Sequence, residues 1–160
     1  MIVIVMGVAG SGKTTIGRNL AQTLNWRYLD ADDFHSSPNV EKMKSGIPLD
    51  DDDRRPWLLS LQRALLESSE ARQSVVLACS ALRQAYREML SINDSVRFVY
   101  LKGDYELISD RLRARPDHYM NPALLDSQLE ALEHPHDALT IDAALSPKAI
   151  IESILTELKL

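Results

Sequence analysis

The sequence opens with an apolar, β-branched run that leads straight into a glycine-rich octet, Gly7-Val8-Ala9-Gly10-Ser11-Gly12-Lys13-Thr14. Every position of the octet fits the phosphate-binding pattern G-x-x-x-x-G-K-[ST]. The glycines allow backbone turns that a β-carbon would block, so successive N–H groups can point at one anion. Ile16, Leu20 and Leu24 then follow at the spacing of one helix face. A strand, a tight loop and an amphipathic helix in this order predict a nucleotide-binding α/β domain.

The residues of the octet have separate tasks at a bound nucleotide. Lys13 is placed to reach the β- and γ-phosphates, and the Thr14 hydroxyl is a suitable ligand for Mg²⁺. The helix that begins here directs its positive dipole end at the same phosphates. The predicted nucleotide-binding residues of this loop are Gly7, Val8, Ala9, Gly10, Ser11, Gly12, Lys13, Thr14 and Thr15.

Length and composition limit the class of protein further. A chain of 160 residues suits one domain, 1–160, with a sizeable core. The net charge of −5 gives no electrostatic case for binding nucleic acid. The single cysteine, Cys79, excludes an internal disulfide and fits a reducing compartment. The first apolar run is only about five residues long and has no basic leader, so we expect neither a signal peptide nor a membrane span. We therefore expect a cytoplasmic location.

Five short apolar segments are predicted to be strands, with helical patterns between them. The strands are expected near residues 2–6, 27–30, 74–78, 96–101 and 139–141. Helices are expected near 38–46, 54–67, 81–90, 104–114 and 122–133, with a last one from Ser146-Pro147. In the second of these helices, Leu58, Leu61, Leu65 and Leu66 are expected on one apolar face. The alternation predicts an α/β fold of the three-layer P-loop NTPase type, a five-stranded parallel sheet flanked by helices. Its site should lie at the carboxyl ends of the strands.

Two carboxylates follow the second predicted strand. Asp30 and Asp32 alternate along the chain, so both are expected on the side of the phosphate loop. One of them can hold Mg²⁺, directly or through water, and the other can orient and deprotonate an attacking hydroxyl. Loop solvation or helix capping is the structural alternative, because Asp is common in turns. Beside a phosphate loop we favour Asp30 for the metal and Asp32 for the hydroxyl, with Asp33 structural or solvated.

Segments well beyond the octet resemble the gluconokinase family, small P-loop kinases that phosphorylate D-gluconate at O6. The matching segments, in order, are Asp30-Ala31-Asp32-Asp33-Phe34-His35, Asn39-Val40-Glu41-Lys42-Met43, Gly46-Ile47-Pro48-Leu49, Asp51-Asp52-Asp53-Arg54, Pro56-Trp57-Leu58, Cys79-Ser80-Ala81-Leu82-Arg83, Tyr86-Arg87, Tyr100-Leu101-Lys102-Gly103, Arg115 with His118, and the stretch 120–133. The resemblance implies a fold similar to shikimate and nucleoside monophosphate kinases, with ATP and Mg²⁺ as cofactors and D-gluconate as substrate. It also implies a substrate-binding segment at about 32–58, a small lid at about 111–121, and a product that feeds the pentose phosphate or Entner–Doudoroff routes.

The same resemblance suggests which residues contact the sugar acid. Shikimate kinases hold a carboxylate with an arginine similarly placed after their catalytic Asp, which makes Arg54 the first choice here. Alternatively, Arg54 only offsets the run Asp50–Asp53 or opposes a helix dipole. We expect that run to be an exposed loop leading into a helix. Ser80 either contacts the sugar acid or caps the next helix. Arg83 and Arg87 share a helix face, and either can reach the substrate, although we favour exposure at the surface. The predicted substrate-binding residues are Asp32, His35, Lys42, Arg54, Ser80, Arg83 and His118.

Basic residues from 111 to 115 predict part of the lid. Arg111 and Arg115 are one helical turn apart, and Pro116 ends the helix. Over the γ-phosphate, both would stabilise charge on its equatorial oxygens, whereas the structural alternative is a basic helix end matched to its dipole. Pro116-Asp117 stands where many relatives have Lys-Gly, and the connection 133–138 is shorter than is usual in the family. The predicted catalytic residues are Lys13, Asp32 and Arg115, with Arg111 and Arg115 also at the nucleotide.

Other functions fit the sequence less well. The nearest alternative is a kinase of the same build that acts on shikimate, a nucleotide or another sugar acid. A guanine-nucleotide switch is disfavoured because neither N-K-x-D nor D-x-x-G occurs, and the acidic net charge counts against a nucleic-acid ATPase. Apolar helices leave a homodimer open. We therefore predict ATP-dependent phosphorylation of D-gluconate, without nucleic acid or membrane partners.

Overall fold

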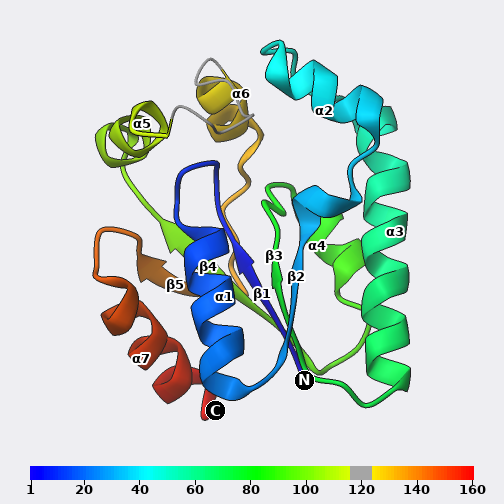
Figure 1. The fold of residues 1–160 in the computed structure, drawn as a ribbon, viewed down its shortest axis with the longest axis vertical. Helices are drawn as coiled ribbons and strands as arrows, with labels where there is room; N and C mark the ends of the chain where they lie inside the picture. Colours follow the sequence, from blue (N-terminus) through cyan, green and yellow to red (C-terminus); the bar gives the residue numbers. More distant parts are fainter. Residues whose placement is uncertain (116–123) are drawn as a thin grey trace.

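The computed structural model describes residues 1–115 and 124–160 and contains a central parallel sheet (Figure 1). Its strands are β1 (Ile2–Met6), β2 (Arg27–Asp30), β3 (Val75–Ala78), β4 (Val96–Lys102) and β5 (Leu139–Asp142). They lie in the order β2-β3-β1-β4-β5, and every neighbouring pair is parallel. The predicted five-stranded parallel sheet is therefore confirmed, with strand ends within one residue of those expected.

The helices follow the strands in alternation. They are α1 (Lys13–Leu24), a 3-10 turn η1 (Ala31–Phe34), α2 (Ser37–Lys44), α3 (Asp51–Glu70), α4 (Gln84–Leu90), α5 (Tyr105–Arg113), α6 (Leu124–Ala131) and α7 (Pro147–Leu158). The start of α7 is as predicted, since the Ser146 hydroxyl accepts a hydrogen bond from the Ala149 N–H at 3.2 Å. Within the described residues, no helix combines the length and the apolar character that a bilayer span requires.

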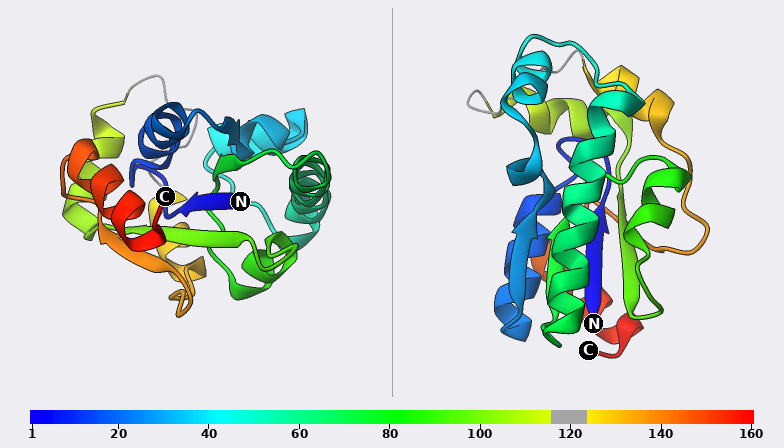
Figure 2. Two further views of the ribbon diagram at one scale, coloured as in Figure 1. Left: turned by 90° about the horizontal axis from the view of Figure 1, so that it is seen from below. Right: turned by 90° about the vertical axis from the view of Figure 1, so that its right-hand side faces the viewer.

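Alternation along β1 assigns the helices to the two faces of the sheet. Ile2, Ile4 and Met6 pack in one core cluster with residues of α3 and α4, whereas Val3 and Val5 belong to a second cluster with residues of α1 and α7. The ribbon views show these helix pairs on opposite sides of the sheet (Figures 1 and 2). Because both faces are covered, β1 is apolar at every position and does not alternate between apolar and polar residues.

The start of α3 differs from the prediction of an exposed acidic loop. Asp50 accepts a hydrogen bond from the Asp53 N–H at 2.7 Å, and the Asp53 carboxylate accepts one from the Asp50 N–H at 3.1 Å. This reciprocal capping box satisfies helix donors that would otherwise lack partners, so the helix begins three residues earlier than residue 54. Carboxylates in a first turn also interact favourably with the helix dipole.

The buried face of α3 is also partly different from the predicted one. Leu58, Leu61 and Leu65 are buried as expected, but Leu66 is 41% exposed, and Trp57 takes a place in the core. The Trp57 indole N–H donates to the carbonyl oxygen of Ala31 at 2.7 Å. This bond joins α3 to η1, which follows β2, and so fixes the helix beside the carboxyl edge of the sheet.

The segment after β3 turns sharply before α4 begins. Ala81 has a φ of +44°, in the left-handed region, which interrupts helical geometry and delays the helix to Gln84. The expected start at residue 81 is therefore wrong, and Ser80 does not cap α4. The chain instead passes Ser80 and Leu82 along the same sheet edge that carries the phosphate loop, where the Gly7 N–H donates to the Ser80 carbonyl oxygen at 3.4 Å.

Candidate active site

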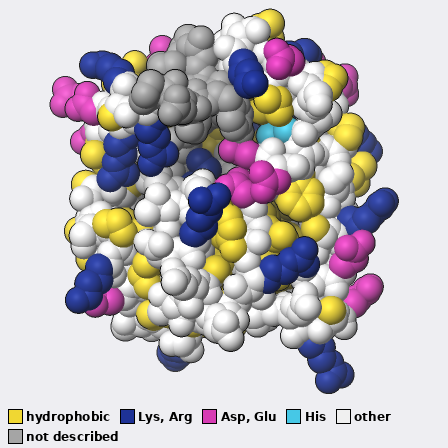
Figure 3. Space-filling model, in the orientation of Figure 1, with side chains coloured by type: hydrophobic (Ala, Val, Ile, Leu, Met, Phe, Trp, Pro, Cys, Tyr) yellow, Lys and Arg dark blue, Asp and Glu magenta, His cyan; other side chains and the backbone are white. Residues whose placement is uncertain are grey.

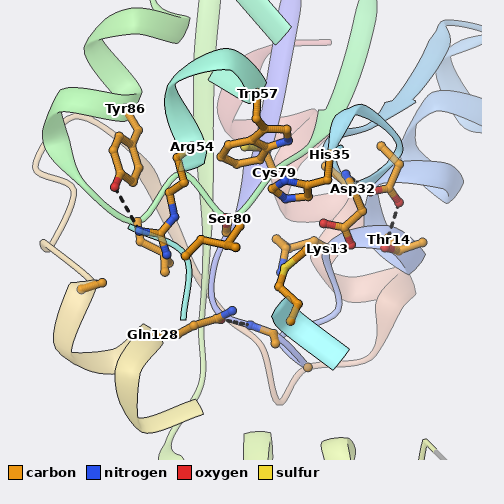
Figure 4. Close-up of a pocket in the computed structure, with 18 of the residues that line it drawn as sticks. Lys13, Thr14, Asp32, His35, Arg54, Trp57, Cys79, Ser80, Tyr86 and Gln128 are labelled. Atoms are coloured by element: carbon orange, nitrogen blue, oxygen red, sulfur yellow. Dashed lines mark hydrogen bonds between the residues drawn. The ribbon is translucent and has the colours of Figure 1, made fainter. Parts of the chain in front are cut away.

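A cleft opens at the carboxyl edge of the sheet, between the phosphate loop, η1, α3 and α6 (Figure 4). Most of the predicted site residues meet there, although they come from segments far apart in the sequence. The space-filling view shows acidic, basic and histidine side chains close together in the upper half of one face (Figure 3). The predicted residues on the cleft wall are Ala9, Gly10, Gly12, Lys13, Thr14, Asp30, Asp32, His35, Arg54, Ser80 and Arg115.

The phosphate loop follows β1 and adopts a backbone that requires glycine. Gly7 has a φ of +149°, and a β-carbon there would lie 2.9 Å from the carbonyl oxygen of Leu101. The loop curls around Lys13, whose ammonium donates to the Val8 carbonyl oxygen at 2.9 Å. Burial lowers the pKa of Lys13, while the nearby Asp32 carboxylate raises it. Among the described residues, the acceptor of this partly buried ammonium is one neutral carbonyl, so its charge is well suited to bind an anion.

Two later helices contact the same loop. Gln128 of α6 accepts a hydrogen bond from the Ala9 N–H at 2.7 Å through Oε1. Arg111 of α5 donates to the carbonyl oxygens of Ser11 at 3.2 Å and Ala143 at 2.7 Å. Arg111 is therefore held against the loop backbone and is not on the cleft wall, whereas Arg115 is. The contact of Gln128 has no signal in the spacing of the sequence and was missed.

Asp30 caps the next turn, as the structural alternative held, and also contacts the phosphate-loop residue Thr14. Its Oδ1 accepts from the Asp32 N–H at 3.1 Å and caps η1. Its Oδ2 accepts from the hydroxyls of Tyr28 at 2.8 Å and Thr14 at 3.3 Å. Burial and the Asp30 hydrogen bond raise the pKa of Tyr28, which stays a protonated donor. The Thr14 hydroxyl and the Asp30 carboxylate together form an oxygen-only set, and such oxygens are the ligands that Mg²⁺ prefers.

Asp32 and His35 lie next to each other in the cleft, between Trp57 and Thr14 (Figure 4). Asp32 is exposed, and within the described residues its carboxylate accepts no hydrogen bond, so it is free to accept a proton. His35 stacks on Trp57, with ring centroids 4.4 Å apart and planes 11° apart. Burial lowers the pKa of His35, Arg54 lowers it further and Asp32 opposes the change. The ring is therefore neutral at pH 7 and can offer one N–H and one acceptor nitrogen.

Arg54 is the basic side chain that enters the cleft from α3. Its Nη1 donates to the Tyr86 hydroxyl at 3.2 Å, and its guanidinium carbon lies 5.7 Å from the centroid of that ring. Figure 4 shows Arg54 between Tyr86 and Ser80. No carboxylate of the described residues forms a salt bridge with Arg54, so the acidic run does not occupy its donors directly. Its charge remains available for an anionic ligand.

Some predicted substrate residues lie away from the cleft. Lys42 pairs with Asp53 at 2.9 Å, and Arg83 is exposed just before α4, so neither lines the cleft. The expected exposure of Arg87 is wrong, because it is only 4% exposed and donates to the carbonyl oxygens of Ala81 and Leu82 at 2.8 and 3.1 Å. Its role is to hold the turn before α4. His118 and the pair 116–117 lie outside the described residues.

Cys79 forms part of the cleft floor and is buried and free. Burial raises the pKa of its thiol to about 12, so the thiolate that a nucleophile needs is absent at neutral pH. This agrees with the sequence-based view of Cys79 as a small apolar residue. The chemistry of the cleft is thus that of a phosphate loop with carboxylates and cations.

Comparison with known proteins identifies the family to which this cleft belongs. The shikimate kinase family model matches residues 9–159. A probable gluconokinase from Dictyostelium discoideum is 44% identical over an alignment of 173 positions, which covers 99% of this chain and 86% of that protein. The chain belongs to the gluconokinase family. It is therefore a kinase, and the resemblance carried by residues 30–58 is confirmed.

Solved structures agree with the gluconokinase family fold. An unliganded sugar kinase from Janibacter sp. HTCC2649 superposes with a TM-score of 0.92 at 41% identity, over 99% of this chain and 94% of that chain. A gluconokinase from Sinorhizobium meliloti 1021 gives a TM-score of 0.86 at 36% identity, over 98% of this chain and 90% of that one. The family assignment thus covers the cleft as well as the sheet.

Proposed function

We propose that this protein transfers the γ-phosphoryl group of ATP to O6 of D-gluconate, forming ADP and 6-phospho-D-gluconate. The observation that carries the proposal is Arg54, a cation without a carboxylate partner among the described residues, in the same cleft as the phosphate loop and Asp32. A guanidinium binds a carboxylate through two parallel hydrogen bonds, which suits an acidic sugar. The names of the relatives support the same substrate.

The phosphate loop supplies the nucleotide side of the reaction. The N–H groups of the loop and the start of α1 bind the phosphates, with Thr15 next in the helix. Lys13 exchanges the Val8 carbonyl oxygen for a phosphate oxygen, and Arg115, which also lines the cleft, contacts the same group. Both cations then stabilise the charge that spreads over the transferring phosphoryl group.

Asp32 supplies the acceptor side. Its free carboxylate accepts the proton from the 6-hydroxyl as O6 attacks the γ-phosphorus. The O6–P bond forms while the bond to the β,γ-bridging oxygen breaks, and ADP leaves with that electron pair. Arg54 binds the carboxylate at the other end of the substrate, so the extended acid lies along the cleft between these two residues. His35 and Ser80 line the space between them and can bind hydroxyl groups.

Mg²⁺ is the metal that this site fits. Thr14 and Asp30 would hold it, Asp30 directly or through water, because they present hydroxyl and carboxylate oxygens close together. When bound, the ion neutralises charge on the β- and γ-phosphate oxygens. Contact with the substrate remains a prediction for Lys42, Arg83 and His118. We also infer a cytoplasmic location, supported by the ATP requirement and by the free Cys79 thiol.

A coupled ADP-release assay tests the proposed function. The purified protein is given ATP and Mg²⁺ with D-gluconate, other aldonic acids, shikimate, nucleoside monophosphates or water alone. We expect turnover on D-gluconate that greatly exceeds turnover on water and on shikimate, with 6-phosphogluconate identified as the product. Preferred turnover on another acceptor would refute gluconate as the substrate while leaving the phosphate-loop chemistry in place.

A further inference from the structure

The acidic run Asp50–Asp53 has no role in the mechanism, yet its members make different contacts. Asp50 and Asp53 form the capping box of α3, and Asp53 also pairs with Lys42. Asp51 instead accepts a hydrogen bond from the Tyr86 hydroxyl of α4. Asp52 is exposed and makes no side-chain hydrogen bond within the described residues. Asp51 is therefore the member of the run that contacts a residue of the cleft wall.

Tyr86 contacts Arg54 in two ways. Its hydroxyl oxygen accepts from Arg54 Nη1 at 3.2 Å, and its ring lies under the guanidinium with 5.7 Å from the guanidinium carbon to the centroid. Tyr86 is only 7% exposed, so its ring has little freedom to move. A long arginine side chain held by a fixed ring and hydroxyl loses its rotamer freedom before the ligand arrives, and this preorganisation strengthens binding.

The order Asp51–Tyr86–Arg54 has an electrostatic consequence. If Asp51 paired with Arg54 directly, its carboxylate would occupy the donors that a ligand carboxylate needs. The interposed phenol uses one of the five guanidinium donors and adds no charge at the guanidinium itself. Asp51 in turn accepts the phenolic proton and polarises the hydroxyl, which makes its oxygen a better acceptor for Arg54. The arrangement fixes the position of Arg54 without neutralising it.

We propose that Tyr86 and Asp51 are positioning residues that hold Arg54 ready for the carboxylate of a linear sugar acid and thereby make the site prefer the acid over its uncharged analogues. The inference rests on the proposed function, because it assigns the partner of Arg54 to the acceptor substrate. It adds a residue from α4 and a residue of the acidic run to the machinery that selects the substrate.

The test is Tyr86→Phe, which removes the hydroxyl and keeps the ring. Wild type and variant are assayed with D-gluconate and with D-gluconamide, in which an uncharged amide replaces the carboxylate. We expect KM for gluconate to rise about tenfold, the loss of one hydrogen bond to a charged group, with kcat and KM for ATP within about twofold. KM for gluconamide should stay unchanged. An equal rise for both acceptors, or no rise for gluconate, would overturn the proposal.

Asp51→Ala provides a second test at an exposed residue, and Asp52→Ala is its matched control. Both substitutions remove one carboxylate from the first turn of α3, so the helix dipole and the net charge change equally. Because the phenol loses its acceptor but keeps its place, we expect about a threefold rise in KM for gluconate with Asp51→Ala. Asp52→Ala should match wild type. Equal effects of the two variants would mean a general charge effect and would contradict positioning.

Failure of the proposed function is distinguishable from failure of this inference. If wild type does not phosphorylate gluconate but accepts another sugar acid, the function proposal fails. The positioning proposal is then tested with that acid and its amide. If wild type shows no preference for any acid over its amide, Arg54 does not bind a carboxylate and the inference is wrong. Thermal unfolding of each variant, expected within about 2 °C of wild type, separates altered binding from lost structure.

Discussion

Replacing Asp32 by Asn tests the proton-transfer step most directly. The substitution keeps the shape of the side chain and removes its ability to accept a proton. Asp32 suits this test because its carboxylate accepts no hydrogen bond from the described residues, whereas Asp30 accepts three. The loss of the Asp32 charge therefore breaks no hydrogen bond among the described residues, although it removes the carboxylate that raises the pKa of Lys13.

The expected size of the effect follows from the reaction and from the surroundings of Asp32. A positioned general base contributes about 10²- to 10⁴-fold, and the loose transition state of phosphoryl transfer places the expected loss at the lower end. We expect kcat to fall about 10²- to 10³-fold, which corresponds to about 3–4 kcal/mol. ATP affinity should not fall, because Asn removes a negative charge near Lys13 and the phosphates.

Single-turnover kinetics and calorimetric ATP binding measure the two quantities separately. Asp33→Asn is the matched control, since it removes the same charge from the adjacent exposed residue of η1. The control should retain wild-type turnover within about twofold. If Asp32→Asn also turned over gluconate at close to the wild-type rate, Asp32 would not be the base and the assigned mechanism would be refuted.

Two further predictions concern stability. Burial lowers the pKa of His35 below its value in the unfolded chain, so the unfolded state binds more protons as the pH falls below about 6.5, and the protein should lose stability there. Urea unfolding at pH 5.5 and 7.5 should show a smaller pH dependence of stability for His35→Gln than for wild type. Equal dependence in the two proteins would contradict the assignment to His35. Leu61 of α3 is fully buried against the sheet, so Leu61→Ala should lower the free energy of unfolding by about 2–5 kcal/mol. A loss below about 1 kcal/mol in urea unfolding would mean that the core closes around the cavity.

The sheet and the phosphate loop were predictable because their signals are local. Each strand is a short apolar segment, and the glycines of residues 7–12 are required by the backbone that they adopt. The start of α3 was not predicted, because four adjacent aspartates resemble a solvated loop until the capping box pairs Asp50 with Asp53. The start of α4 was missed for a similar reason, since nothing in its local sequence marks Ala81 for a left-handed turn.

The candidate site was predicted in part. Asp30 ends β2 and Asp32 lies in η1 just after it, so sequence order was enough to place both at the carboxyl edge of the sheet. Arg54, in the first turn of α3, was assigned from the family resemblance. Contacts between distant segments were not accessible in this way. Arg87 looked like a surface arginine because its carbonyl partners lie in a turn whose shape depends on tertiary structure. Lys42 looked available because its partner Asp53 belongs to another helix.

The hydrogen bonds of Arg111 and Gln128 have a consequence for how the phosphate loop is linked to α5 and α6. Arg111 of α5 contacts Ser11, and Gln128 of α6 contacts Ala9, so the helices on both sides of residues 116–123 are tied to one short loop. A phosphate that alters the conformation of this loop changes the free energy of both contacts at once. Thermodynamic reciprocity then requires that a ligand or substitution that changes these two contacts through the loop alters nucleotide affinity by the same coupling factor. The phosphate loop is thus a point of energetic coupling as well as a binding surface.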